Sequence, residues 1–332
     1  MTAANELTSL KIRELTIEVA VMGRWISVPA LALGARYTFL KGGWLKVAAV
    51  HQEDWTPGEI ERPDLWIKVL KKCPIGGRLA DVFTFAQKLP NANPKYAYQI
   101  EWSSSAVVRI RSFKDWWETL PQETRKNVRR AQKRGLIASV RELDDDLVRG
   151  IMNINDESPT VQGRRSRHYG KNFEQVWKDQ LDYLERSAFV CAHDGAEMVG
   201  FMKLVRCGDF ASILTTLTKR SHQGKRPANA LIARAIQFCE DEGIRYLVYG
   251  LLNYGNKRDG SLREFKLRNG FNEVLIPRYY VPLTARGKIA LRLGLHRGLI
   301  GILPSPAVRL AVGLRTRFYA FKQSFRAGVA QW

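Results

Sequence analysis

The residues best suited to chemistry form a basic loop in the second half of the chain. The stretch 219–226 (KRSHQGKR) carries four cations and directly precedes a helix, which the apolar spacing of residues 229–242 predicts. Pro227 suits the first turn of that helix, and Gly243 suits the position after its end. Cations oppose the positive end of a helix dipole unless a bound anion compensates them. The loop therefore predicts either a phosphate-binding site or a solvated basic surface.

An irregular polar segment in the middle of the chain offers groups for proton transfer and anion binding. Glu157 or His168 could act as a general base that removes the proton from an attacking amine. A loop glutamate can equally be an exposed charge or a helix cap. The guanidinium groups of Arg164 and Arg165 match the geometry of phosphates and carboxylates. Together with Tyr169, they are candidates for substrate binding.

A dense basic helix is predicted in TRKNVRRAQKRG, which ends at Gly135. Arg125 and Arg130 belong to its charged face and are further candidates for holding an anionic substrate. A charge run of this kind is also typical of a solvated helix face. The spacing of Ser112 and Asp115 predicts an N-terminal cap for a preceding helix.

Strands and helices around these groups must position them. Residues 187–217 predict three strands with a hairpin turn at Asp194-Gly195. The stretch 211–250 predicts a strand, the basic loop, a helix and a second strand, and a short helix follows in SLREFKLRNGF. This alternation predicts an α/β protein with a mixed sheet. The N-terminal half carries weaker signals for strands at 15–22, 44–50 and 96–111, and for a helix at 64–72.

Composition limits the classes of partner. The chain has 332 residues, enough for roughly two domains. Its formal net charge of +21 indicates an anionic partner such as nucleic acid, acidic lipid headgroups or a phosphorylated substrate. The four cysteines include no C-x-x-C pair, so neither a metal site nor a disulfide scaffold is expected, and a cytoplasmic setting fits best. No apolar run reaches the roughly 18 residues of a membrane-spanning helix.

The C-terminal segment has a different composition. From Val274 to Trp332 it contains no Asp or Glu but ten Lys and Arg, dispersed among aliphatic and aromatic residues. We expect residues 284–332 to form a basic amphipathic tail that contacts an anionic membrane surface. Packing on the protein itself and binding to nucleic acid are the alternatives.

The sequence QGKRPANALIARAIQFCEDEGIRYLVYG resembles the core of the GNAT acyltransferase superfamily. In that family, a loop of pattern Gln/Arg-x-x-Gly-x-Gly/Ala holds the pyrophosphate of acyl-coenzyme A. Gln223 and Ala228 match the ends of the pattern, whereas Arg226 replaces its central glycine. The resemblance implies that the donor phosphates are held by one run of residues: Gln223, Gly224, Lys225, Arg226, Ala228 and Asn229.

Two further motifs resemble the FemAB-like branch of that superfamily, namely the TRKNVRRAQKRG helix and the pair Phe265-Lys266. The resemblance implies a cation, Lys266, near the acyl carbonyl, in place of the tyrosine acid of ordinary acetyltransferases. An ammonium in a dry cleft would stabilise the oxyanion that develops there.

The resemblance also implies a tandem GNAT-like fold, with a first half at 1–112, an acyltransferase domain at 113–283 and the basic tail after it. The expected function is transfer of an acyl or aminoacyl group to an amine acceptor, which could be a cell-envelope or lipid-linked molecule. The donor would be acyl-CoA or aminoacyl-tRNA, without a metal. The alternative is a non-catalytic module of this fold that binds anionic membrane or RNA.

Overall fold

The computed structural model describes residues 12–21, 24–90, 92–161, 164–166, 168–253 and 260–297. These residues form two compact units. Unit 1 comprises the described residues up to 104 together with those from 274 onward, and unit 2 comprises those from 105 to 273.

Unit 2 contains a mixed sheet with the strand order β6-β13-β12-β11-β10-β7. All neighbouring strands are antiparallel except β12 and β13, which are parallel and are joined by the crossover helix α7. The bounds are β6 Gln99–Arg109, β7 Leu136–Arg141, β10 Ser187–Asp194, β11 Glu197–Cys207, β12 Phe210–Thr218, α7 Pro227–Asp241 and β13 Tyr246–Leu251. The predicted strands of 187–217 and the predicted strand-loop-helix-strand of 211–250 are thus confirmed.

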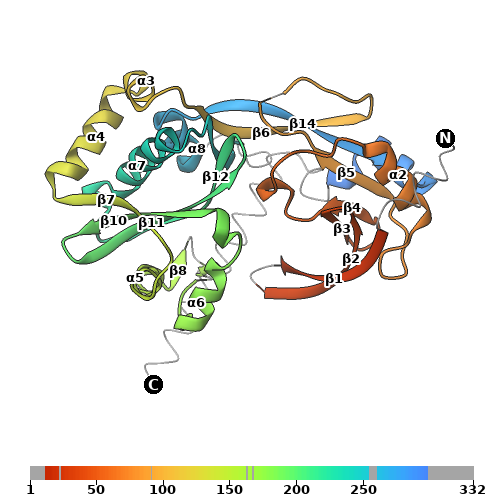
Figure 1. The fold of residues 1–332 in the computed structure, drawn as a ribbon, viewed down its shortest axis with the longest axis horizontal. Helices are drawn as coiled ribbons and strands as arrows, with labels where there is room; N and C mark the ends of the chain where they lie inside the picture. The colour runs from red at the N-terminus through yellow and green to blue at the C-terminus, as the bar shows by residue number, and fades with distance from the viewer. Residues whose placement is uncertain are drawn as a thin grey trace. The chain divides into compact units, whose positions relative to one another are not determined.

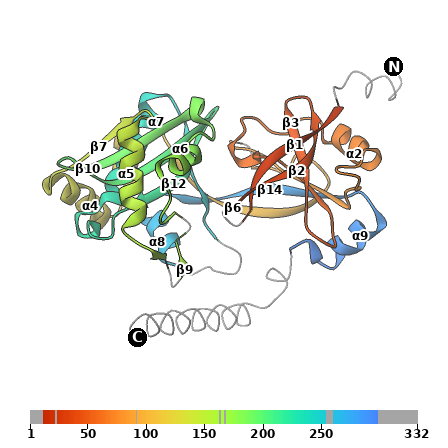
Figure 2. The ribbon, with the colours of Figure 1, turned by 90° about the horizontal axis from the view of Figure 1, so that it is seen from below.

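Helices cover both faces of this sheet. On one face lie α3, α4, α7 and α8, and on the other lie α5 and α6, which stand in front of the strands in Figure 2. The bounds are α3 Phe113–Thr119, α4 Gln122–Lys133, α5 Asp145–Asp156, α6 Phe173–Gln180 and α8 Ser261–Arg268, with a small hairpin of β8 Thr160–Val161 and β9 Arg164–Arg165. Ser112 Oγ accepts a hydrogen bond from the Asp115 N–H at 3.0 Å, which confirms the predicted cap of α3.

Unit 1 repeats the topology of unit 2. Its strand order is β1-β2-β3-β4-β5-β14, again antiparallel except for one parallel pair, β4 and β5, joined by the crossover helix α2. The bounds are β1 Ile12–Val21, β2 Arg24–Leu33, β3 Arg36–Lys41, β4 Val47–Val50, α2 Pro63–Lys72, β5 Val82–Ala86, β14 Asn272–Pro282 and α9 Ala285–Arg292. Short 3₁₀ turns lie at Glu53–Trp55, Leu184–Arg186, Gln223–Lys225 and Leu295–Arg297.

The last strand of each unit comes from an unexpected part of the chain. β6 follows β5 in sequence, yet its residues 105–109 pair with β13 of unit 2. β14 follows α8 in sequence, yet it pairs with β5 of unit 1. The structure therefore groups the chain differently from the boundaries predicted at 112 and 283, because strand pairing returns residues from 274 onward to unit 1.

The beginning of the predicted basic tail packs on unit 1. Ala290 and Leu291 of α9 are buried against Leu45 and Val82. The helix ends at Arg292, and Gly294 has a positive φ of 70°, a conformation that glycine adopts without steric cost. The predicted amphipathic segments of residues 298–332 lie outside the described residues. No helix in the described part of the chain is long and apolar enough to cross a membrane.

A buried carboxylate fixes the start of α9 to the sheet of unit 1. Asp81 is fully buried and accepts hydrogen bonds from Lys46 N–H at 2.9 Å, Thr284 Oγ1 at 2.8 Å and Arg286 Nε at 3.0 Å. Burial alone would raise the pKa of Asp81, but these three hydrogen bonds outweigh it and lower the pKa below the ordinary value of 3.8.

Replacing this carboxylate should destabilise unit 1. We expect Asp81→Asn to lower the free energy of unfolding by about 1–3 kcal/mol, because buried donors lose a charged acceptor. Since the native pKa is lowered, the carboxylate stabilises the wild type fully above pH 3.8 and progressively less as the pH falls through the native pKa. Urea unfolding at several pH values measures both effects, with exposed Glu18→Gln as the matched control. Equal stability of Asp81→Asn and wild type at neutral pH would contradict this role.

Candidate active site in unit 2

The parallel strands β12 and β13 pair over only part of their length. Their register runs from Phe210 with Tyr246 to Ser212 with Val248 and then stops. Beyond this point β12 continues to pair with β11. On its other side, the pairing of β13 with β6 is irregular between Val248 and Leu251, where Gly250 has a positive φ of 56°. The end of β13 therefore leaves the regular ladder, and its backbone groups need other partners.

Lys266 supplies a donor for these backbone groups. Its Nζ donates hydrogen bonds to the carbonyl oxygens of Tyr249 at 2.5 Å and Leu251 at 2.8 Å. It also lies 4.4 Å from the centroid of the Tyr249 ring. The side chain is fully buried on α8, and this burial lowers the pKa of Lys266 to about 8. A lysine predicted from its motif thus lies at the end of β13, beyond the residues that pair with β12.

Asparagines fix α8 to α7 next to this lysine. Asn269, almost fully buried, accepts a hydrogen bond on Oδ1 from Asn229 Nδ2 at 3.0 Å, and its backbone oxygen accepts one from Trp116 Nε1 at 3.1 Å. Asn229 was expected at the donor phosphates. The structure instead places its side chain inside unit 2, where it holds two helices together.

The basic loop has the backbone of a glycine-rich turn despite its sequence. Residues Gln223–Lys225 form a 3₁₀ turn, and Arg226 then adopts a left-handed conformation with φ 63° and ψ 45°. Pro227 begins the 15-residue helix α7, as predicted. Arg134, at the end of α4, donates a hydrogen bond to the Gly224 carbonyl oxygen at 2.8 Å. The loop is therefore held from α4 as well as by its own turn.

Acidic side chains neutralise part of the loop's charge. Asp194 forms an ion pair with Lys225 and lies 3.3 Å from His222 Nε2. Glu197 forms an ion pair with Lys219 at 2.5 Å. Both acids flank the Asp194-Gly195 hairpin turn, which brings them beside a loop that follows more than 20 residues later. Arg226 is exposed, and within the described residues no carboxylate forms an ion pair with it.

Glu157 binds the same loop. Its carboxylate accepts hydrogen bonds from the backbone N–H of Arg220, the backbone N–H of Ser221 at 3.1 Å, and Ser221 Oγ. Burial opposes ionisation, but the hydrogen bonds from Ser221 and Arg220 outweigh it and lower the pKa of Glu157. A carboxylate with a lowered pKa is a weak base. In this structure the residue expected to take a proton instead positions the loop.

The remaining predicted residues are more dispersed. His168 is half-buried, with its backbone N–H donating to Ser166 Oγ at 3.3 Å, and Tyr169 is exposed. Arg164 and Arg165 form β9, and their side chains lie outside the described part of the structure. On α4, Arg130 Nη1 donates to Asn127 Oδ1 at 3.4 Å. Arg125 on the same helix is half-buried.

Several features of the candidate site were not predicted from the sequence. The carbonyl oxygens of Tyr249 and Leu251 carry no side-chain signature, although the glycine between them in YLVYGLL marks an irregular strand. Thr216 on β12 has a buried hydroxyl oxygen without a hydrogen-bond partner in the described structure. It belongs to the part of β12 that β13 has left.

Comparisons with known proteins agree with this architecture. Structures of similar fold include FemX (11% identity, 87% of this chain and 92% of that chain, TM-score 0.50). The C-terminal domain of a putative lysylphosphatidylglycerol synthetase from Agrobacterium fabrum has 13% identity, with 87% and 90% covered and a TM-score of 0.52. A conserved protein of unknown function from Bacteroides thetaiotaomicron has 12% identity, with 81% and 86% covered and a TM-score of 0.52.

At these identities the likeness shows the fold alone, and it agrees with the predicted FemAB-like resemblance. No curated protein matches the chain. The family described as "Acetyltransferase (GNAT) domain" matches residues 122–259, a range that contains the parallel strand pair, its crossover helix and the basic loop. This segment of unit 2 therefore matches the GNAT acetyltransferase domain family.

Proposed function

We propose that the protein is an N-acyltransferase that moves an acyl group from a thioester donor to an amine acceptor, with the reaction at the separation of β12 and β13. The observation that carries the proposal is the position of Lys266, whose buried ammonium lies at the end of β13. The basic loop follows β12 and leads into α7. A buried cation and a basic loop thus lie at the ends of the two strands that separate.

The backbone geometry of the basic loop supports acyl-CoA as the donor. The family pattern has glycine where this chain has Arg226, and Arg226 adopts the left-handed conformation that glycine would supply. Pro227 has no N–H, and the N–H groups of Asn229 and Ala230 donate to the Arg226 carbonyl oxygen at 3.1 and 3.3 Å. The Ala228 N–H is therefore the backbone donor at the start of α7 that we expect to bind a phosphate. Gln223–Arg226 would hold the phosphates, and acyl-CoA would supply the activated acyl thioester. No observation specifically favours aminoacyl-tRNA, so acyl-CoA is the donor we propose.

The acidic side chains around the basic loop are compatible with phosphate binding by that loop. Asp194 and Glu157 hold Lys225 and the 220–221 backbone in place. A phosphate that arrives at a fixed loop loses less free energy to ordering the loop. The exposed Arg226 guanidinium is the group that we expect to contact it, because its charge has no acidic partner among the described residues.

Lys266 acts by its fixed positive charge. Two carbonyl oxygens hold its ammonium in place, so little reorganisation is needed when the oxygen of the reacting carbonyl gains negative charge. The attacking amine must also lose a proton, and Glu157 is a poor acceptor for it. His168 remains our candidate for that step. The acceptors to be tested should include free amino acids and polyamines, which carry amines. A lipid with a glycerol headgroup, for which one structural relative is named, carries hydroxyl groups instead and is the contrasting acceptor.

Two buried lysines, Lys266 and Lys203, allow an effect on catalysis to be distinguished from an effect on stability. Lys203 resembles Lys266 closely: it is buried, donates to the carbonyl oxygens of Gln180 at 2.6 Å and Asp182 at 2.7 Å, and has a pKa lowered to about 8. We expect Lys266→Met to lower kcat by about 10²–10³-fold, because the transition state loses its cation. Lys203→Met should destabilise the fold yet keep kcat per folded molecule.

The assay is release of the CoA thiol from acyl-CoA with the acceptor panel, corrected for the folded fraction. Equal losses of kcat in Lys266→Met and Lys203→Met would mean that Lys266 has only a structural role. Polyanion binding with a steep salt dependence but no thiol release would favour the non-catalytic module.

The pH dependence gives an independent test. Because burial lowers the pKa of Lys266 to about 8, its ammonium loses its charge as the pH rises through that value. We expect kcat to fall above pH 8 in the wild type and in Lys203→Met. In Lys266→Arg, whatever activity remains should show no such fall, because arginine keeps its charge. A fall of the same midpoint in Lys266→Arg would assign the titration to another group.

Arg226 should show opposite effects on stability and donor binding. A left-handed conformation costs a non-glycine residue roughly 1–2 kcal/mol. Part of this is offset by the greater freedom of glycine in the unfolded chain, so we expect Arg226→Gly to be more stable than Arg226→Ala by about 0.5–1 kcal/mol. Both should weaken CoA binding, since both lose the guanidinium. Urea unfolding and calorimetric titration with CoA measure the two effects, and tighter CoA binding by Arg226→Gly than by wild type would contradict the phosphate contact.

A further inference from the structure

A cavity in unit 2 lies apart from the separated strands. Its volume is about 740 Å³, and it is an open cavity lined by residues of α3, α4, β7 and α7. The strands β11 and β10 lie between β12 and β7 in the sheet, so the cavity belongs to the opposite end of the sheet from β13. Small-molecule sites typically measure roughly 300–1,000 Å³. The proposed transfer reaction uses none of its lining residues.

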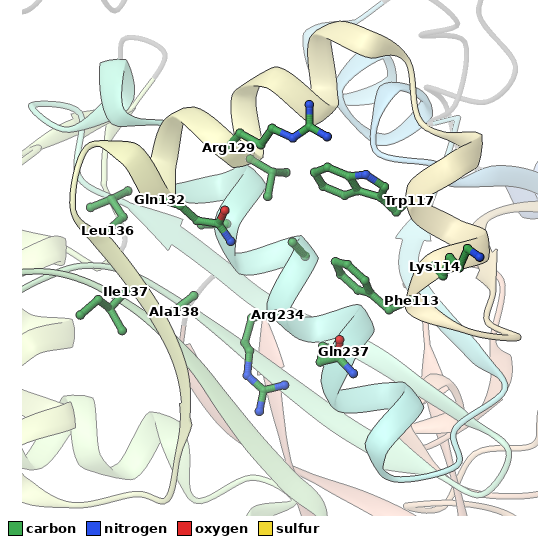
Figure 3. Close-up of a pocket in the computed structure, with 13 residues that line it drawn as sticks. Phe113, Lys114, Trp117, Arg129, Gln132, Leu136, Ile137, Ala138, Arg234 and Gln237 are labelled. Carbon is green, nitrogen blue, oxygen red and sulfur yellow. The ribbon is translucent and has the colours of Figure 1, made fainter.

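The interior of this cavity is apolar. Ala230 and Ala233 of α7 have small side chains that leave its floor open, and the rings of Phe113 and Trp117 form one wall. Figure 3 shows both rings directed toward the space between α7 and the helices α3 and α4. An apolar surface of this kind suits hydrocarbon, because contact with it removes the hydrocarbon from water.

The rim of the cavity is cationic. Lys114, Arg129 and Arg234 lie there, and the described lining residues include no carboxylate. Arg234 is partly neutralised by Asp241 at 3.3 Å. Arg129 instead lies over the Trp117 ring, 5.4 Å from its centroid, and within the described residues no carboxylate forms an ion pair with Arg129 or Lys114. The cavity lining therefore carries positive charge, from Arg129 over the Trp117 ring and from Lys114, that no carboxylate of the described residues pairs with.

Ile137 extends the apolar surface outward from the cavity. It lines the cavity from β7, and its side chain is 67% exposed. A large aliphatic group beside cations suits an occupant that is part hydrocarbon and part anion.

We propose that this cavity binds a single-chain anionic amphiphile, with its acyl chain against Phe113, Ala230 and Ala233 and its anionic end at Arg129 and Lys114. The shared chemistry is one hydrocarbon chain that ends in a carboxylate or a phosphate. A free fatty acid and a lysophospholipid are its two sources. The binding site is separate from the proposed reaction, so it can be tested by binding alone.

The test is calorimetric titration of the full chain with saturated fatty acids from octanoate to palmitate, below their micelle concentrations, and with the alcohols of the same chain lengths. We expect affinity to rise about fourfold for each added methylene until the cavity is filled. The alcohols should bind at least about tenfold more weakly, because they lack the charge-assisted contact. Lysophosphatidylglycerol of equal chain length distinguishes the two sources. Tighter binding than that of the fatty acid would indicate that the site takes a phosphate, and weaker binding would indicate that it takes a carboxylate.

Three variants on the exposed side of α4 locate the site. Arg129→Gln should weaken the binding of the fatty acids about tenfold and leave the binding of the alcohols unchanged. Gln132→Trp places a large ring in the cavity and should weaken the binding of both. Lys133→Gln, on the same helix but outside the cavity lining, is the matched control and should change neither.

Two results would overturn the proposal. One is an affinity that does not depend on chain length and is matched by inorganic polyphosphate, which would mean attraction to a basic surface only. The other is undiminished fatty-acid binding by folded Gln132→Trp, as judged by its urea unfolding, which would place the occupant elsewhere.

Discussion

The architecture of the candidate site depends on how the protein satisfies two backbone carbonyl groups. When β13 leaves β12, the oxygens of Tyr249 and Leu251 lie where the regular ladder no longer continues. A buried polar group without a partner costs about 1–3 kcal/mol. Lys266 donates to both oxygens, so it satisfies them at the irregular end of β13 and also brings a positive charge there. One side chain links the shape of the site to its electrostatics.

The corresponding place in unit 1 is built differently. There the parallel register of β4 and β5 ends at Ala49 with Thr84. Just beyond it, Glu53 accepts a hydrogen bond from the Ala86 N–H at 2.7 Å and forms an ion pair with Arg278 at 2.9 Å. The residues before α2 are acidic where those before α7 are basic, as the sequences EDWTPGEIER and KRSHQGKR show. Two units of one topology thus favour different charges at the same position, and only the basic loop suits a phosphate.

Much of unit 2 follows from local sequence, because its signals are short in range. The Asp194-Gly195 turn, Pro227 at the start of α7 and the apolar spacing of that helix each depend on neighbouring residues. Lys266 was found through a motif of two residues and lies at the separated strands. The conformation of Arg226 could not be predicted, because an arginine with a positive φ contradicts its own preference.

Long-range contacts were not predictable from local patterns. Asn229 was expected at the loop, but its amide binds Asn269, 40 residues later. Glu157 was expected to transfer a proton, but it binds backbone groups 63 and 64 residues later. In the N-terminal half, α2 and parts of β1, β4 and β6 matched their predicted ranges, whereas β2, β3 and β5 were not predicted. Pairing partners that are distant in sequence decide each of these features.

Each sheet is completed by a strand that lies in the sequence next to the other unit. β6 is encoded with unit 1 but its second half completes the sheet of unit 2, and β14 is encoded after unit 2 but completes the sheet of unit 1. A gene cut between the two halves would leave each sheet with an unpaired edge at β5 or β13, and exposed edges invite aggregation. Each unit therefore depends on a strand that lies next to the other unit in the sequence, so unit 1 is needed for the fold of both halves whatever the chemistry of its acidic loop.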